Sequence, residues 1–202
     1  MEAIYCFAIS FVLIFLSELG DKTQILVLSF SSKLKSSTLL FGVALGSFFS
    51  HGIAILFGST LGYLSSAKIH YYLEIVTYFS FILIGIFSLL QRKNHIQNIE
   101  KSSIINIAKL KLNYIFIIAI SIAIGEIGDK TFLASVGLGI KYPFAKLFLI
   151  LGAIFGMCMS NLIAIAFGKL LSKKIPSNFL EKSSSVLFLL FGVLGLIRFL
   201  LM

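Results

Sequence analysis

Ser17-Glu18-Leu19-Gly20-Asp21-Lys22-Thr23 places three charged side chains inside an otherwise apolar segment. A second copy, Gly125-Glu126-Ile127-Gly128-Asp129-Lys130-Thr131, follows 108 positions later, and both copies contain Glu-x-Gly-Asp-Lys-Thr. A charged side chain at the centre of a lipid bilayer costs about 2.5–3.5 kcal/mol on insertion scales. Because so unfavourable a motif occurs twice in surroundings that resemble lipid, we expect it to carry the function.

The composition is that of an integral membrane protein. Hydrophobic residues make up 58% of the 202 residues, charged residues make up 12%, and the mean hydropathy is +1.04. The net charge of +9 does not indicate a nucleic-acid partner, because the basic residues fall mostly between apolar runs. The expected surroundings are therefore a lipid bilayer.

Six apolar segments reach the length of about 20 residues that a membrane span requires. They run approximately over 3–30, 38–65, 70–90, 112–140, 145–171 and 179–201. A barrel strand would alternate in polarity, whereas these runs are apolar throughout, so we predict transmembrane helices. The predicted fold class is an all-α membrane protein with six transmembrane helices.

The two halves of the chain are repeats. The second and fifth segments align at small residues that recur every four positions: Gly42 with Gly152, Gly46 with Gly156, Ser50 with Ser160, Ala54 with Ala164, and Gly58 with Gly168. Such ridges allow close helix packing in lipid. We predict a first three-helix repeat over 1–90, a linker loop over 91–111 and a second repeat over 112–202. Three spans per repeat is an odd number, so the second repeat is predicted to be inverted in the membrane.

The distribution of basic residues predicts the orientation. With the N-terminus outside, eleven Lys and Arg residues lie in the inner loops and four in the outer loops. This asymmetry predicts that both termini lie outside and that the 91–111 loop is cytoplasmic, in a bacterial plasma membrane or an organelle membrane.

The motifs lie about 20 Å from the faces at which their segments enter, near the bilayer midplane. Within an intact helix, Glu18, Asp21 and Lys22 would share one side, as would the matching residues of the second copy. Alternatively, the helix can unwind at Gly20 and at Gly128, exposing backbone carbonyls. The sequence leaves these two possibilities open.

Four carboxylates converging from the two motifs would form an oxygen-rich site, which hard divalent cations such as Ca²⁺, Mg²⁺ and Mn²⁺ prefer. The predicted cation- and proton-binding residues are Glu18, Asp21, Glu126 and Asp129. Crowded carboxylates away from water also favour protons, so the two ions would compete, as an antiporter requires. Thr23 and Thr131 add hydroxyl oxygens. Lys22 and Lys130 either neutralise the empty site or reach a helix end. Alternatively, the charged residues of each motif form only an internal ion pair, Glu18 with Lys22 and Glu126 with Lys130, that holds helices together.

The duplicated Glu-x-Gly-Asp-Lys-Thr in a six-span chain of about 200 residues resembles the Golgi and chloroplast manganese/calcium:proton exchanger family, which has bacterial members. The resemblance implies transport of Mn²⁺ or Ca²⁺ against protons, with the four motif acids as the cation site. Thr23, Gln24 and Thr131 match as polar companions. The second copy departs from the family pattern at Lys130, Thr131 and Phe132, where Arg, Ser and Gln are common.

Other polar residues within the spans have less specific interpretations. His51 and Asn161 occupy one repeat position beside the small-residue ridges, next to Ser50 and Ser160. These four residues either line a pathway or form hydrogen bonds between helices.

The predicted function is a secondary active divalent cation/proton antiporter working by alternating access, with no permanently bound cofactor. The alternatives are an exporter of another solute, such as a basic amino acid, a passive cation channel, and an intramembrane enzyme. The sequence disfavours an enzyme because it offers no nucleophile with a partner base. The small-residue ridges also suit a homodimer contact.

Overall fold

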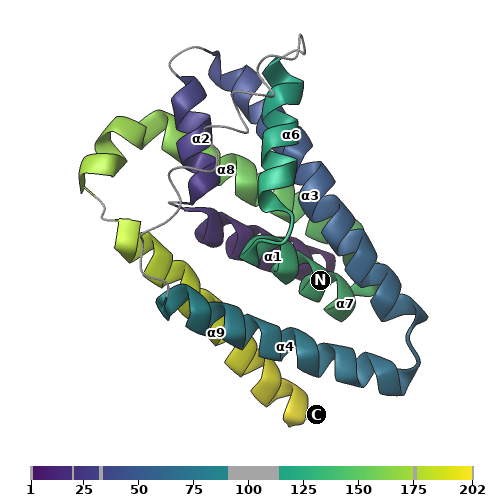
Figure 1. Ribbon diagram of the computed structural model, residues 1–202. Coiled ribbons are helices and arrows are strands. Elements are labelled where there is room, and N and C mark those ends of the chain that lie inside the picture. Colours follow the sequence, from purple (N-terminus) through teal and green to yellow (C-terminus); the bar gives the residue numbers. More distant parts are fainter. Residues whose placement is uncertain (1, 20, 32–33, 91–113, 175–176, 202) are drawn as a thin grey trace.

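The structure is a computed structural model that describes residues 2–19, 21–31, 34–90, 114–174 and 177–201. Within these ranges the regular elements are helices, as Figure 1 shows. The all-α prediction is therefore confirmed for the part of the chain that is described. The predicted linker loop at 91–111 lies outside the described residues.

Helices occupy each of the six predicted apolar segments, and the described α-helices follow the same order in the two halves. The first half contains α1 (Glu2–Glu18), α2 (Lys22–Ser31), α3 (Ser36–Leu64) and α4 (Ala67–Leu90). The second half contains α6 (Tyr114–Glu126), α7 (Lys130–Lys141), a short 3-10 helix η1 (Pro143–Ala145), α8 (Lys146–Lys174) and α9 (Ser177–Leu200). Within the described residues of each half, two short α-helices precede two long ones, with η1 between the two pairs in the second half.

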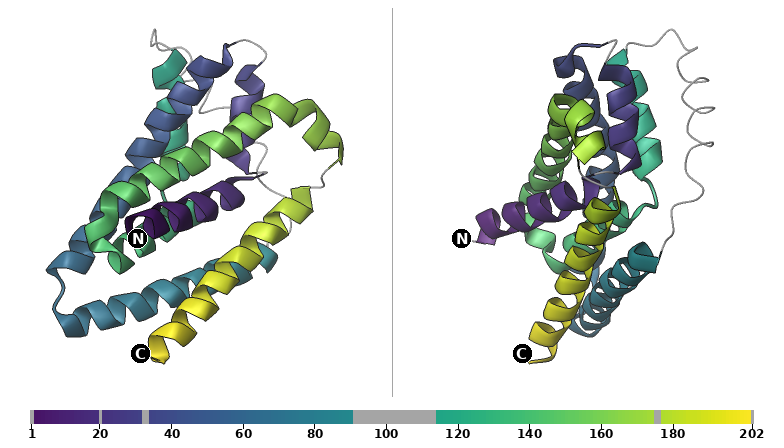
Figure 2. Two further views of the ribbon diagram at one scale, coloured as in Figure 1. Left: turned by 180° about the vertical axis from the view of Figure 1, so that it is seen from behind. Right: turned by 90° about the vertical axis from the view of Figure 1, so that its left-hand side faces the viewer.

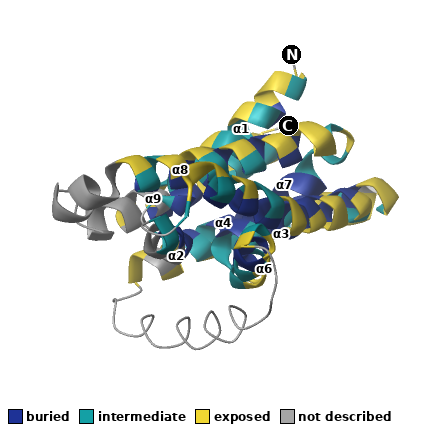
Figure 3. Ribbon diagram, turned by 90° about the horizontal axis from the view of Figure 1, so that it is seen from above, coloured by how far each residue is buried: buried dark blue, intermediate teal, exposed yellow. Residues whose placement is uncertain are grey.

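The outer surface of the molecule is apolar. Among the described residues, three helical stretches, Ser36–Leu64, Lys68–Phe87 and Pro143–Ala166, are long and apolar enough to cross a membrane, and Tyr114–Glu126 and Ser185–Leu200 are shorter apolar helices. Large apolar side chains such as Phe41, Phe57 and Phe155 are exposed. Figure 3 shows exposed residues mainly on the outward faces of the helices and buried residues mainly toward the centre. A surface of this kind is suited to lipid rather than to water.

The small-residue ridge of α3 packs against the two short helices of the other half. A Cβ atom on Gly46 would lie 2.7 Å from the backbone oxygen of Ala119 in α6, and one on Gly58 would lie 2.1 Å from the backbone oxygen of Val136 in α7. The ridge of α8 packs in the same way against α1, because a Cβ atom on Gly152 would lie 2.4 Å from the oxygen of Phe7. The ridges thus bring the halves into backbone contact, as their sequence pattern predicted.

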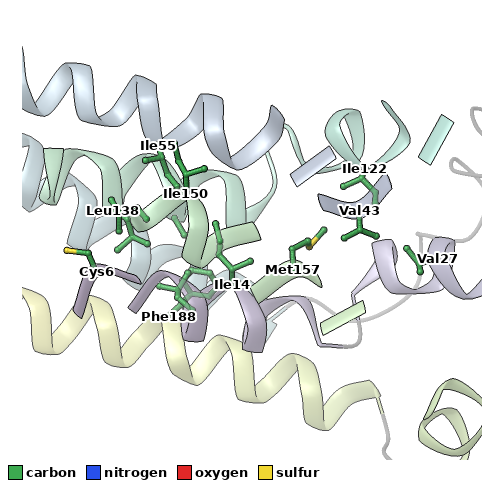
Figure 4. Packing of buried hydrophobic residues seen from close by; sticks show 14 of the residues in the cluster. Cys6, Ile14, Val27, Val43, Ile55, Ile122, Leu138, Ile150, Met157 and Phe188 are labelled. Carbon is green, nitrogen blue, oxygen red and sulfur yellow. The ribbon is translucent and has the colours of Figure 1, made fainter. Parts of the chain in front are cut away.

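A continuous apolar core lies between these helices. Figure 4 shows Ile14 of α1, Met157 of α8 and Phe188 of α9 among its buried members. In α9, Phe188 meets Phe81 of α4 with 6.0 Å between the ring centroids. Helices α4 and α9 also approach closely where a Cβ atom on Gly192 would lie 2.9 Å from the backbone oxygen of Tyr78. These two helices lie side by side along one edge of the molecule (Figures 1 and 2).

The close approach at Gly58 predicts that Gly58→Ala destabilises the fold by about 1–3 kcal/mol, because the added methyl group would overlap the Val136 carbonyl. Thermal unfolding in detergent measures the effect. Gly52→Ala, in the same helix, is the matched control, because a Cβ atom there would meet only Phe48 Cδ2, at 3.8 Å. Equal unfolding midpoints for the two variants would contradict this packing.

Candidate functional site

Both motif helices are broken at the motif. Helix α1 ends at Glu18 and α2 begins at Lys22, whereas α6 ends at Glu126 and α7 begins at Lys130. In each break the amide of the motif aspartate donates to the carbonyl of the motif glutamate, over 3.2 Å in the first copy and 3.0 Å in the second. Of the two possibilities that the sequence left open, the structure has the unwound one, so the motif residues do not share one side of a continuous helix.

The second break depends on a glycine. Gly128 has φ of +82°, in the left-handed region that glycine adopts without steric penalty. Gly20, its counterpart, lies outside the described residues. An L side chain at position 128 would be strained, so the motif glycine is explained by the backbone turn.

The breaks place the acidic side chains at helix ends. Each motif glutamate is the last residue of a short helix, where the partial negative charge of the helix terminus favours a nearby cation. Asp129 immediately precedes the first residue of α7, where the partial positive charge favours a carboxylate. At each break, the start of the second helix therefore stabilises the aspartate carboxylate, and the end of the first helix attracts a cation toward the glutamate.

Residues from the two motifs meet at the centre of the structure. Glu18, Glu126 and Asp129 each offer a carboxylate oxygen, and these oxygens all lie within 4.8 Å of one another. Both glutamates are fully buried. The Thr23 hydroxyl donates to Glu18 Oε2 and the Thr131 hydroxyl donates to Glu126 Oε2, each over 2.9 Å. The two copies thus contain the same hydrogen-bonded glutamate–threonine pair.

The spacing of these oxygens is compatible with one hard cation. Ca²⁺–oxygen distances of 2.3–2.6 Å allow two ligands of one ion to lie up to about 5 Å apart. Glu18 Oε1 and Glu126 Oε1 are buried without a hydrogen-bond partner among the described residues. A buried carboxylate oxygen without a partner is unfavourable, and either a cation or a proton would satisfy it.

The other motif residues surround this cluster. Asp21 is not among the three grouped carboxylates, although its Oδ2 is also buried without a hydrogen bond in the described part of the chain. The ammonium group of Lys130 interacts electrostatically with all four motif carboxylates. This favours the predicted neutralising role for that lysine. The Lys22 side chain is outside the described residues.

Two polar contacts hold the second short helix of each half against the long helix of the other half. Gln24 of α2 donates from Nε2 to the backbone oxygen of Ser160 in α8 over 3.0 Å and also contacts the Ser160 hydroxyl. His51 Nδ1 of α3 lies 2.9 Å from the hydroxyl of Ser135 in α7. Sequence reasoning missed Ser135. It lies four residues after Thr131, and this helical spacing was the available signal.

The remaining candidates for a pathway are buried but bond within their own helices. The Ser50 hydroxyl donates to the Ser47 carbonyl over 3.4 Å, and Asn161 Nδ2 donates to the Met157 carbonyl over 3.0 Å. A pathway role for Ser50, Ser160, His51 and Asn161 stays a prediction.

Comparisons with known proteins agree with the duplicated sequence. A sequence model described as "Divalent cation/proton antiporter GDT1" matches residues 6–96 and 114–202, one match in each half. A Vibrio cholerae serotype O1 protein named "Putative manganese exporter" is 29% identical over 188 residues, which cover 92% of this chain and 88% of that protein. The "GDT1-like protein 5" of Oryza sativa subsp. japonica is 39% identical over 83 residues, which cover 40% of this chain and 34% of that protein. No solved structure matches the chain.

The family matches cover both halves, including both motifs and most of the described helices. The resemblance that the motifs suggested is confirmed, and the chain belongs to the divalent cation/proton antiporter GDT1 family.

Proposed function

We propose that the chain exchanges Mn²⁺, Ca²⁺ or both for protons at a site formed by the two broken-helix motifs. The observation that carries this proposal is the grouping of Glu18, Glu126 and Asp129 within 4.8 Å in the buried centre of the molecule. Asp21 is the fourth acidic residue of the proposed site. Carboxylates that bind a hard cation when ionised lose it when protonated, so one set of oxygens serves both ions.

The proposed mechanism is alternating access between two inverted repeats of three spans each. Broken helices at a central site are typical of transporters built from inverted repeats. The shared order of helices in the two halves supports this architecture, as do the separate family matches to each half. In this mechanism the site opens to one face at a time, and protons release the cation at the face where it is exported.

The proposed orientation has both termini outside and the 91–111 loop in the cytoplasm. It rests on the excess of basic residues in the inner loops, eleven against four. The direction of transport across a cell membrane would then be export of the cation from the cytoplasm.

Removal of one site carboxylate is expected to abolish most of the exchange. In proteoliposomes with an imposed pH gradient, Glu18→Gln and Asp129→Asn should each lower Mn²⁺ and Ca²⁺ flux at least tenfold, because each removes an ionised oxygen ligand. Glu2→Gln is the matched control, since Glu2 is an exposed acid at the other end of α1. Fluorescent cation and pH indicators measure both ions.

Three results would contradict the proposal. Flux no faster than in empty vesicles would rule out cation exchange, and unchanged flux in both site variants would rule out this site. Cation movement without opposite movement of protons would favour a passive channel.

The threonine hydroxyls are expected to tune affinity rather than to be essential. Thr131→Val removes the 2.9 Å hydrogen bond to Glu126, so the cation concentration for half-maximal flux should rise about tenfold, with a smaller loss of maximal rate. Thr60→Val is the control, because the exposed Thr60 hydroxyl donates within its own helix, to the Leu56 carbonyl. The same change in both variants would exclude a specific role for Thr131.

The orientation has a separate test. A single reporter cysteine at position 103, Ser103→Cys in a Cys6→Ala/Cys158→Ala background, should be protected from a membrane-impermeant thiol reagent in intact cells and should react after permeabilisation. Reaction in intact cells would invert the proposed topology without affecting the proposed exchange.

A further inference from the structure

An ion pair far from the motifs links the two halves. Lys141, the last residue of α7, places Nζ 2.9 Å from Glu74 Oε1 and 3.0 Å from Glu74 Oε2 in α4. The Glu74 side chain is only 9% exposed and the Lys141 side chain 26%. A bidentate, partly buried pair of this kind contributes more than an ordinary surface salt bridge.

Aromatic and histidine side chains surround the pair. The Lys141 ammonium lies 5.4 Å from the ring centroid of Tyr78 in α4 and 5.8 Å from that of Phe199 in α9. On the other side, His70 Nε2 lies 3.4 Å from Glu74 Oε1. Lys141 therefore contacts both helices of the α4–α9 pair, and its position is fixed by charge and by the aromatic faces.

A cavity of about 860 Å³ lies beside this contact. Residues of α1, α7 and η1 line it on one side and residues of α4 and α9 on the other, with Cys6, Lys141 and Phe199 among them. A cavity between two packed groups of helices can change in volume when one group moves relative to the other. The Lys141–Glu74 pair spans the two groups.

Helix α7 connects the pair to the motif site. Asp129 and Lys130 lie at its N-terminal end and Lys141 at its C-terminal end, eleven residues or about 16 Å further along the axis. Because a helix of this length moves as a rod, a displacement at one end is transmitted to the other.

We propose that the Lys141–Glu74 ion pair is a latch that holds the α4–α9 pair against α7 and opens once in each exchange cycle. The two residues are positioning residues, since they act on the carboxylate site through α7. This inference rests on the proposed alternating access. The latch is the contact that must break when the carboxylate site opens toward the face of the membrane at which α7 ends.

The sequence repeats the same two residue types in the other half. Lys141 follows the motif Lys130 by eleven positions, and Lys33 follows Lys22 by eleven. When the third and sixth segments are aligned at an offset of 107 positions, Leu73-Glu74 matches Leu180-Glu181, so Glu181 is at the repeat position of Glu74. The side chains of Lys33 and Glu181 are outside the described part of the chain. An ion pair that served only local packing would not require a lysine and a glutamate at the matching positions of both halves.

The native Cys6 provides a direct test, because it lines the cavity and is 1% exposed. In Cys158→Ala protein reconstituted into lipid nanodiscs, where both faces are accessible, the rate of Cys6 modification by a charged methanethiosulfonate reports opening. Glu74→Gln and Lys141→Met should each raise this rate about tenfold, the change that corresponds to about 1.4 kcal/mol in the closed-to-open equilibrium.

Restoring the charges should restore protection. In the exchanged pair Glu74→Lys/Lys141→Glu, the rate of Cys6 modification should return toward that of the parent, and the same is expected for the conservative Lys141→Arg. Both variants should also recover any maximal flux that the single variants lose. Lys146→Met, which removes an exposed lysine at the start of α8, is the matched control. Each variant should elute as a single species in size-exclusion chromatography, and Cys6 should react equally fast in all variants once they are unfolded in detergent. These two controls distinguish opening from misfolding.

The outcomes distinguish the latch from the exchange on which it rests. Unchanged Cys6 rates in the single variants, or rates that the exchanged pair fails to restore, would overturn the latch even where flux is normal. Absence of flux in the parent protein would overturn the proposed exchange, whereas the labelling rates would still decide whether the pair controls opening.

Discussion

Two fully buried glutamates constrain the whole structure. A carboxylate in the interior is tolerated only when its oxygens have partners. In each motif the threonine five residues after the glutamate provides one hydrogen bond, to Oε2, while Oε1 remains without one among the described residues. Neither half can satisfy its own glutamate completely. The halves bring these carboxylates together at the motifs, where the proposed cation or proton would complete their pairing.

The packing of the long helices makes this meeting possible. Gly46 and Gly58 let α3 contact the backbones of α6 and α7, and Gly152 does the same for α8 against α1. Each long helix thus supports the broken helix of the opposite half. Small residues serve packing in lipid because the hydrophobic effect gives little preference for one apolar contact over another there. The ridges position the broken helices, and the broken helices position the carboxylates.

The sequence predicted the helices, the ridges and the convergence of the two motifs, because each depends on a local pattern or on a repeat. Solid apolar runs leave a helix as the only open-chain structure in lipid, and the small residues of the ridges recur every four positions. The break at the motif was not predictable, because a helical Gly20 or Gly128 satisfies the same pattern as an unwound one. The contacts of Lys141 also escaped prediction, since a lysine at a helix end normally indicates an interface with water.

The exceptions to the repeat explain why symmetry alone does not identify the polar contacts around the site. Gln24 of α2 bonds to Ser160 of α8, but its counterpart in α7 is Phe132, which cannot form that bond. In the second half the equivalent link joins Ser135 of α7 to His51 of α3, and the counterpart of Ser135 in α2 is Val27. Each half therefore keeps one polar link between a long helix and the second part of a broken helix, with different residues at different positions. The carboxylate–threonine pairs, in contrast, are identical in both copies. Selection on a shared central site would keep those pairs the same, whereas a link that only holds two helices together can be replaced.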